Sequence, residues 1–336
     1  MRLKPVPDVP QGLVSRTLSF EDNSRCAVLF GRHHEHLAVL EQYIPVSLAA
    51  RGNLVTISGE MEPVDAAASV LEGLYRRLDG GLDLGRNEVD AAARMALHEP
   101  GAVATLTGDD VAIRTERRRV SPRSPAQAAY LRAMRDHDLV FGIGPAGTGK
   151  TYLAVATGVA LLKQRVVDRL ILSRPAVEAG ERLGFLPGDM KDKVDPYLRP
   201  LYDALQDMLP DGKLRAKLES GQIEIAPLAF MRGRTLANAF VILDEGQNTT
   251  PAQMKMFLTR LGENSRMVVT GDPSQHDLPP GTRSGLVDAV RRLDQTDEVA
   301  VIRFSEKDIV RHPLVEAILK AYGSEPPLPP EADGHG

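Results

Sequence analysis

The chain has 336 residues, a formal net charge of −4 and a hydrophobic content of 43%. This length allows roughly two or three domains with separate cores, and the near-neutral charge excludes an overall basic field of the kind that indicates nucleic-acid binding. Cys26 is the only cysteine, which excludes an internal disulfide and a cysteine-based zinc site and fits a reducing cytoplasm.

The start of the chain has no pattern of a secretory signal. Residues 1–8 read MRLKPVPD and lack an apolar core. The longest apolar stretch, residues 153–162, falls well short of the roughly 18 residues that a membrane span needs. We therefore expect a cytoplasmic protein without a membrane partner.

Residues 14–80 are typical of a small α/β unit. We expect a strand in the apolar run 27–30 and a helix over residues 36–40. Two short strands, 46–49 and 54–57, follow around a tight turn that contains Gly52. A second helix begins near Pro63, and its apolar residues recur along one face: Val64, Ala67, Ala68, Leu71 and Leu74.

Residues 81–125 are expected to form a linker. A helix is expected at residues 87–97 and a strand at 111–113, followed by the basic run 114–119. Pro122 and Pro125 close the linker. The basic run has two open interpretations, a solvated linker or a track for RNA.

Residues 126–322 alternate apolar strands with helical patterns. The expected strands are 139–143, 169–172, 223–225, 240–243, 267–269 and 299–304. This alternation predicts an α/β fold in which a parallel sheet has helices on both faces. The last segment, residues 323–336, is rich in Pro, Glu, Gly and Asp and is expected to be a disordered tail.

A nucleotide-binding loop follows the first of these strands. Residues 144–151 match the complete G-x-x-x-x-G-K-T pattern, as Gly144, Pro145, Ala146, Gly147, Thr148, Gly149, Lys150 and Thr151. The glycines let backbone N–H groups surround a phosphate, while the lysine reaches the β- and γ-phosphates and the threonine hydroxyl binds Mg²⁺. The strand before the loop and the helix pattern after it supply the context that aims a helix N-terminus at phosphate.

Two carboxylates follow another buried strand. Asp244 and Glu245 come directly after the apolar residues 240–243. Strand carboxyl ends are where open α/β sheets bind ligands, so Asp244 is the expected Mg²⁺ partner. Glu245 is then the candidate general base that orients the attacking water.

A further polar group follows the next strand. Gln275 carries a neutral amide that can sense a γ-phosphate or position water, and Asp272 can hold a neighbouring loop. The alternative interpretation is a Gly-Pro turn with incidental polar groups.

Phosphoryl transfer also requires a cation to neutralise charge in the transition state. Several arginines in the second half of the chain lie near the ends of expected elements. We favour Arg311 and place Arg283 second; the others are Arg174, Arg232, Arg234, Arg260 and Arg303.

The loop and several other segments resemble the PhoH family of bacterial P-loop proteins. The other segments are residues 174–181, 184–189, 196–202, 231–235, 244–250 and 311–313. The resemblance extends over roughly residues 110–322. One departure is Gly246, which stands where the family usually has alanine. From this glycine we expect a local change in backbone freedom and no loss of chemistry.

The resemblance implies an ATPase whose P-loop core is similar to the RecA-type motor of superfamily one helicases, with ATP and Mg²⁺ as cofactors. It implies that Gln127 reads adenine, that Gln247 couples nucleotide to strand contacts and that Arg174 touches nucleic acid. It also implies links to RNA metabolism and phosphate starvation, a ribosome-maturation endoribonuclease as partner, and ring-shaped homo-oligomers such as hexamers.

The unit at residues 14–80 is similar in the order of its segments to a KH RNA-binding domain, in which a G-x-x-G loop clamps the backbone of single-stranded RNA. This chain keeps Gly31 but has His34 at the second glycine position. Arg32, His33, His34 and His36 remain candidates for phosphate contact. A KH-like unit that does not bind RNA is the alternative.

These features predict a Mg²⁺-dependent ATPase, helicase-like in its core and coupled to remodelling or processing of single-stranded RNA. The alternative is a nucleotide-gated adaptor that recruits an endoribonuclease without separating strands. A small-molecule kinase shares the loop but is disfavoured, because Glu245 and Gln275 suit the activation of water.

Overall fold

The computed structural model describes residues 13–79, 84–98, 112–175 and 190–309, together with Val315 and Ile318. Arg311, the segments 176–189 and 311–313, and the tail 323–336 lie outside the described residues. Among the helices that are described, none combines the length and apolar character needed to cross a membrane.

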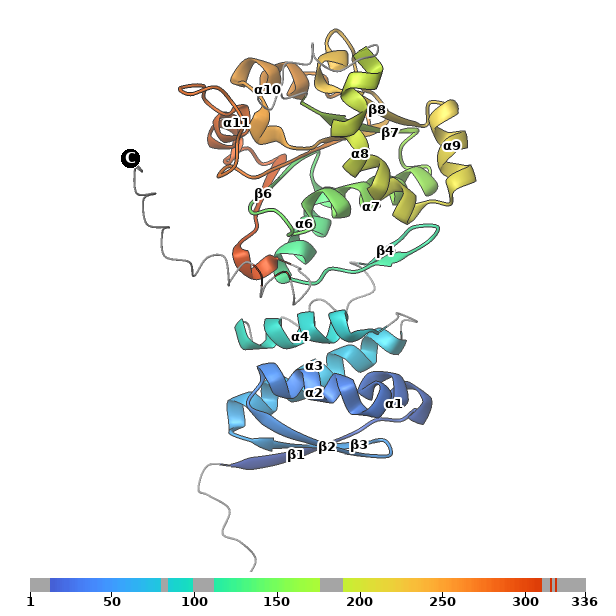
Figure 1. The fold of residues 1–336 in the computed structure, drawn as a ribbon, viewed down its shortest axis with the longest axis vertical. Helices are drawn as coiled ribbons and strands as arrows, with labels where there is room; N and C mark the ends of the chain where they lie inside the picture. The colour runs from blue at the N-terminus through green and yellow to red at the C-terminus, as the bar shows by residue number, and fades with distance from the viewer. Residues whose placement is uncertain are drawn as a thin grey trace, which may run out of the picture.

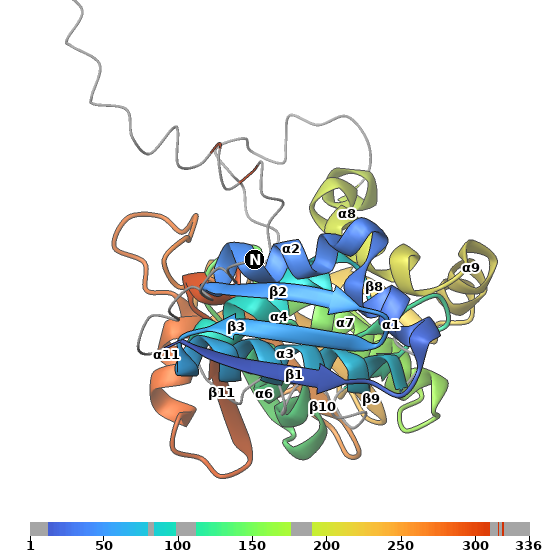
Figure 2. The same ribbon diagram turned by 90° about the horizontal axis from the view of Figure 1, so that it is seen from below.

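The N-terminal module is a three-stranded antiparallel sheet with helices on one face (Figures 1 and 2). The strands lie in the order β1-β3-β2, and Val55 and Ile57 of the central strand are fully buried under the helices. The elements are β1 (Val14–Ser19), α1 (Asn23–Phe30), the 3₁₀ turn η1 (Arg32–His34), α2 (Glu35–Tyr43), β2 (Val46–Arg51), β3 (Leu54–Gly59), α3 (Met61–Asp79) and α4 (Arg86–His98).

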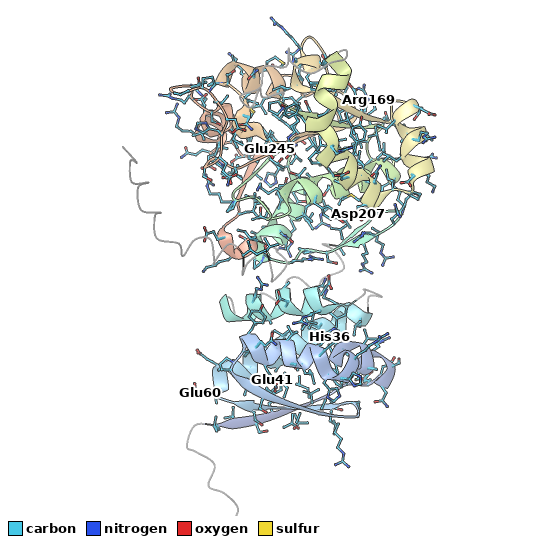
Figure 3. The ribbon with its side chains drawn as sticks, in the orientation of Figure 1. His36, Glu41, Glu60, Arg169, Asp207 and Glu245 are labelled. Carbon is cyan, nitrogen blue, oxygen red and sulfur yellow. The ribbon has the colours of Figure 1, made fainter. Side chains whose placement is uncertain are left out.

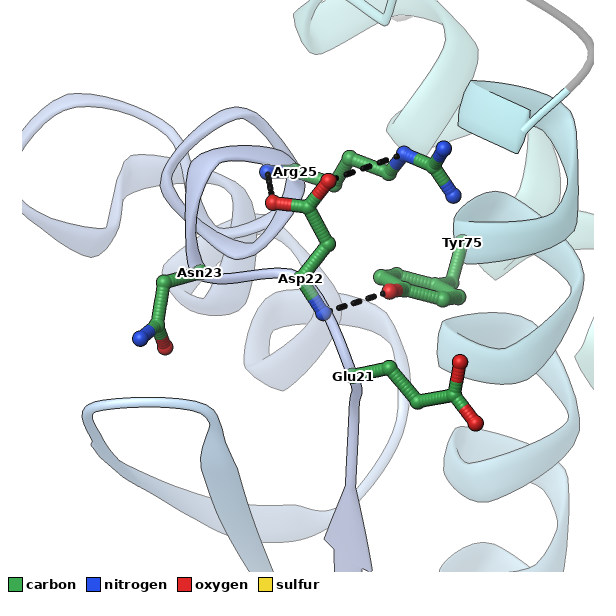
Figure 4. Close-up of a pocket in the computed structure, with 5 residues that line it drawn as sticks. All are labelled: Glu21, Asp22, Asn23, Arg25 and Tyr75. Atoms are coloured by element: carbon green, nitrogen blue, oxygen red, sulfur yellow. Dashed lines mark hydrogen bonds and ion pairs between the residues drawn. The ribbon is translucent and has the colours of Figure 1, made fainter.

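The strand expected at residues 27–30 is wrong, because these residues form the end of helix α1. The Asp22 carboxylate caps this helix by accepting hydrogen bonds from the backbone N–H groups of Ser24 and Arg25. The Asp22 N–H in turn donates to the Tyr75 hydroxyl of α3 at 3.0 Å (Figure 4). Cys26, Leu29 and Phe30 are buried at helical spacing. A run of four apolar residues therefore did not distinguish a strand from a buried helical turn.

The basic run is folded as a hairpin rather than as a free linker. Strands β4 (Ile113–Arg114) and β5 (Arg119–Val120) pair, and the residues between them contact helix α8 (Met190–Met208). Arg118 forms a 2.7 Å ion pair with Asp207, and Arg117 donates to the Gln206 carbonyl at 2.9 Å. Two arginines of the run therefore form intramolecular contacts with helix α8.

The N-terminal module reaches the same linker through α4. Glu88 accepts a hydrogen bond from Arg123 at 3.2 Å, and Figure 1 shows α4 between the small sheet and the larger module. Arg77 is buried next to this pair, and burial is the main cause that lowers the pKa of its guanidinium.

The C-terminal module is a six-stranded parallel sheet in the order β11-β6-β10-β9-β7-β8. Its strands are β6 (Leu139–Ile143), β7 (Arg169–Arg174), β8 (Ile223–Pro227), β9 (Ala239–Leu243), β10 (Arg266–Gly271) and β11 (Val299–Arg303). Each covers or overlaps a strand expected from the sequence. The helices and 3₁₀ turns are α6 (Pro125–Asp136), α7 (Lys150–Lys163), α8, α9 (Asp211–Glu219), η3 (Leu228–Met231), η4 (Gly246–Asn248), α10 (Pro251–Leu258), α11 (Gly285–Leu293) and η5 (Glu306–Asp308).

This sheet has a hydrophobic core on each face, because successive residues of a strand point to opposite sides. In β9, Phe240 and Ile242 belong to the core that contains α6 and α7. Val241 and Leu243 belong to the core that contains α10 and α11. The expected α/β fold with a helix-covered parallel sheet is confirmed.

Helix α7 packs so closely on the sheet that Gly158 has no room for a side chain. A Cβ at this position would lie 2.5 Å from Leu170 Cδ1 and 2.9 Å from Phe240 Cδ1. We expect Gly158→Ala to lower the free energy of unfolding by about 1–3 kcal/mol, through overpacking. Urea denaturation measures the effect.

Gly212→Ala in α9 is the matched control, because in the described part of the chain no atom beyond the neighbouring backbone of its own helix lies within 4 Å of the added Cβ. Alanine is the better helix former, so this variant should be as stable as the parent or more stable. Equal stability of both variants would contradict the packing argument.

Candidate functional site

The topology brings three loops to one edge of the C-terminal sheet. Strands β6 and β9 both pair with β10, so the loops that follow these strands meet at their carboxyl ends. They surround a hollow of about 320 Å³. Its lining residues are Ala146, Gly147, Gly149, Lys150, Thr151, Tyr152, Asp244, Glu245, Gln247, Gly271, Asp272 and Gln275.

The loop 144–151 has the backbone conformation that its glycines permit. Gly147 and Gly149 have φ values of 82° and 81°, in the left-handed region. Gly144 has a φ of 143°, and a Cβ there would collide with the Phe304 carbonyl oxygen. The Gly144 N–H donates to the Gly271 carbonyl at 3.1 Å, which joins the loop to the end of β10.

Lys150 opens helix α7 and is buried at the loop, with 8% of its surface exposed. Its Nζ donates to the carbonyl oxygens of Gly144 and Pro145, both at 2.7 Å. Burial lowers the pKa of this ammonium, and the nearby charges of Asp272, Glu245 and Asp244 oppose that shift. The lysine therefore holds a positive charge inside the curve of the loop, beside the α7 N-terminus.

Asp244 connects the loop with two strands. Its Oδ1 accepts hydrogen bonds from the hydroxyls of Thr151 at 2.6 Å and Thr270 at 2.7 Å, and the residue is 5% exposed. A hydroxyl and a carboxylate side by side are hard oxygen ligands of the kind that Mg²⁺ binds. Thr151 and Asp244 therefore fit the predicted metal site by chemistry and by position.

Glu245, labelled in Figure 3, follows Asp244 directly in the chain. Its backbone is strained, with φ 53° and ψ 40°. Left-handed conformations are uncommon for residues other than glycine, and they concentrate at functional sites. Glu245 Oε1 accepts from Arg174 at 2.7 Å, and Oε2 accepts from the side-chain amide of Gln247. Both carboxylate oxygens therefore have protein partners.

Asp272 and Gln275 line the same hollow, as expected for the loop after β10. Asp272 Oδ1 accepts from the backbone N–H and hydroxyl of Ser274, while its buried Oδ2 has no hydrogen-bond partner among the described residues. The Gln275 N–H donates to the Asp272 carbonyl at 3.1 Å. Asp272 thus organises the loop that carries Gln275.

Gln127 is buried on α6 with its amide in hydrogen bonds to protein. Its Nε2 donates to the Thr148 carbonyl at 3.0 Å, and its Oε1 accepts from the Arg123 N–H at 2.6 Å. Gln127 therefore links α6 and the linker to the nucleotide loop. The adenine-reading role stays a prediction.

The arginine nearest to the carboxylates is not one of the two that the sequence analysis favoured as the transition-state cation. Arg283 is exposed in the loop before α11, whereas Arg174, at the end of β7, lies against both carboxylates. It is 2.7 Å from Glu245 and 3.9 Å from Asp244. Its position at a strand carboxyl end was a signal in the sequence, because the same rule had identified Asp244 and Gln275.

Gly246 does not use a glycine-specific backbone conformation, since its φ is not in the left-handed region. Its space is instead occupied by β10, because a Cβ would lie 2.8 Å from Val269 Cγ1. The expected change in backbone freedom is therefore better described as close packing of η4 against β10.

The chain was compared with known proteins. The family model described as "PhoH-like protein" matches residues 119–323. The chain is 48% identical over 298 residues to the "PhoH-like protein" of Bacillus subtilis (strain 168), covering 88% of this chain and 93% of that protein.

Two further proteins are similar in sequence to this chain. The "PhoH-like protein" of Synechocystis sp. (strain ATCC 27184 / PCC 6803 / Kazusa) is 43% identical over 327 residues, covering 93% of this chain and 97% of that protein. "Protein PhoH" of Escherichia coli (strain K12) is 50% identical over 202 residues, covering 60% and 57% respectively. The parallel sheet, the loop after β6 and these similarities together show that the chain belongs to the PhoH family.

Proposed function

We propose that this protein is a Mg²⁺-dependent ATPase. The observation that carries the proposal is the convergence of Lys150, the linked pair Thr151 and Asp244, and Glu245 around one hollow at the carboxyl ends of adjacent strands. These are the residue types that phosphoryl-transfer sites use to hold phosphates, to hold the metal and to position the nucleophile.

Each group has a distinct part in the proposed reaction. The N–H groups of the loop and the Lys150 ammonium bind the β- and γ-phosphates. Thr151 and Asp244 would hold Mg²⁺, which neutralises phosphate charge when it is bound. Glu245 accepts a proton from the attacking water, and Gln275 orients that water or the γ-phosphate.

We further propose that hydrolysis is coupled to single-stranded RNA through the N-terminal module. The loop Gly31–His34 lies between α1 and α2, and Arg32, His33 and His34 are exposed. His34 has a φ of 63°, so it adopts the conformation that a second glycine would favour. This geometry supports a KH-like clamp despite the missing glycine.

His36 has no part in this clamp. This residue, labelled in Figure 3, lies in the N-terminal module. It is 5% exposed, and its Nδ1 lies 3.1 Å from the carbonyl oxygens of Val28 and Leu29. It ties α2 to the end of α1 and is not available to phosphate.

We predict that Lys150→Ala weakens ATP binding and abolishes detectable turnover, because the phosphate cradle loses its buried cation. Glu245→Gln should keep ATP binding while lowering kcat by about 10²–10⁴-fold, because the amide cannot accept a proton. Phosphate release and equilibrium nucleotide binding measure the two effects separately.

Lys255→Ala and Glu263→Gln are the matched controls, because both residues are exposed and outside the hollow. Parent-like turnover in Glu245→Gln would exclude that residue as the base. ATP binding without turnover in the parent would favour the nucleotide-gated adaptor.

We predict that single-stranded RNA raises kcat of the parent, and that Arg32→Ala and His33→Ala lower RNA affinity several-fold by removing phosphate contacts. Arg51→Ala, an exposed change at the end of β2, is the control. Fluorescence anisotropy measures affinity at fixed salt. Turnover that is indifferent to RNA would exclude the coupling.

We also propose a ring-shaped homo-oligomer in which Arg311 reaches the site of the neighbouring subunit. Mixing subunits that carry Arg311→Ala with subunits that carry Glu245→Gln should then restore part of the turnover, because some sites receive an intact residue of each kind. Size-exclusion chromatography with light scattering determines whether the variants assemble. No restoration by assembled mixtures would exclude the arrangement in trans.

A further inference from the structure

Arg174 interacts with three residues in two segments at the nucleotide site. From the end of β7, its Nη2 donates to Glu245 Oε1 at 2.7 Å, and its Nη1 donates to the Tyr197 carbonyl of α8 at 2.9 Å. Its Nε lies 3.9 Å from Asp244 Oδ2. The side chain is only 20% exposed, so these interactions are partly shielded from solvent.

Arg174 is the cation that pairs with the two carboxylates in the described part of the chain. Lys150 also lies at the hollow, but its hydrogen bonds go to Gly144, Pro145 and Thr148. Two adjacent carboxylates that lack a counter-ion are costly at a partly buried site, because each disfavours the charge of the other. The guanidinium therefore stabilises the pair in the absence of another cation.

The same contacts occupy the atoms that the proposed reaction needs. Asp244 Oδ1 accepts hydrogen bonds from two hydroxyls, whereas Oδ2 faces Arg174. Asp244 would help to hold Mg²⁺, so Arg174 lies beside the carboxylate that the metal would need. Glu245 is held through one oxygen by Arg174 and through the other by Gln247. A divalent cation held by these carboxylates would repel the guanidinium, because both are positively charged.

We propose that Arg174 is a positioning residue that holds Glu245 and Asp244 before Mg²⁺-nucleotide binds and is displaced from them on binding. This inference rests on the proposed nucleotide site. Because Nη1 binds Tyr197 O separately, Arg174 can leave the carboxylates and stay attached to α8. Binding of the metal complex then removes a connection between β9 and α8.

The test measures how strongly Mg²⁺ increases nucleotide affinity. The dissociation constant of ADP is determined by isothermal titration calorimetry in MgCl₂ and in EDTA. The ratio of the constant in EDTA to the constant in MgCl₂ is then compared between variants. Arg174→Met removes the charge and keeps much of the length. We expect this variant to raise the ratio on the order of tenfold, with little change in ADP affinity in EDTA.

Three further variants make the result specific. Arg174→Lys keeps the charge but cannot bind Glu245 and Tyr197 as a fork, so its ratio should lie between those of the parent and Arg174→Met. Arg169→Met removes an arginine from the other end of β7, where it binds the Ala237 carbonyl, and should leave the ratio unchanged. In a Glu245→Gln background, Arg174→Met should raise the ratio by only about twofold, because the two residues act as a pair.

An unchanged or lowered ratio in Arg174→Met would overturn the proposal, since displacement predicts an increase. If that variant does not fold, an unchanged ratio in Arg174→Lys overturns it equally. Failure of the parent to bind ADP under either condition would instead remove the nucleotide site itself. The two failures are thus distinguishable.

Discussion

Asp244 Oδ1 accepts hydrogen bonds from Thr151 and Thr270, and the arrangement of the site depends on this one carboxylate oxygen. Thr151 belongs to the helix after β6, Thr270 to β10, and Asp244 to the end of β9. Because β10 lies between β6 and β9, the oxygen bridges three neighbouring strand ends. A buried carboxylate needs such partners, so the contacts that satisfy Asp244 also fix the loop beside it.

Helix α8 extends this network away from the sheet edge. At one point its Tyr197 carbonyl binds Arg174, and near its end Asp207 accepts from the Tyr152 hydroxyl at 2.7 Å and pairs with Arg118 of the hairpin. Burial and the bond to Asp207 raise the pKa of Tyr152 to about 12, so the phenol remains a donor. The helix is thus bonded both to residues of the nucleotide site and to the linker that leads to the N-terminal module.

Most of the C-terminal fold was predictable, because the four inner strands, β6, β7, β9 and β10, are short apolar runs that are buried on both faces and followed by helical patterns. The N-terminal module was harder. Strand β1 was not identified, and the run 27–30 was assigned to a strand, although its capping by Asp22 and its contacts with α3 make it helical. Short apolar runs satisfy either periodicity, and only their neighbours decide between them.

The residues of the candidate site also fall into a predictable and an unpredictable group. Lys150 and Thr151 were identified by the G-x-x-x-x-G-K-T pattern, and Asp244, Glu245 and Gln275 by their positions after strands of a parallel sheet. The structure brings all five to one hollow. The partners of these residues were not predictable. Arg174 approaches the carboxylates, and Gln127 donates to the Thr148 carbonyl of the loop. In the N-terminal module, His36 is buried with its Nδ1 beside the carbonyl oxygens of Val28 and Leu29.

By itself the sequence determined the loop 144–151, the two carboxylates that follow the strand 240–243 and the parallel sheet of the core, because these follow from local patterns of glycine, charge and apolar residues. Tertiary structure decided which cation meets those carboxylates and whether the basic run is free or bound. Those outcomes depend on distances between segments far apart in the chain: Arg174 and Glu245 are 71 residues apart, and Arg118 meets Asp207 only because α8 packs beside the hairpin.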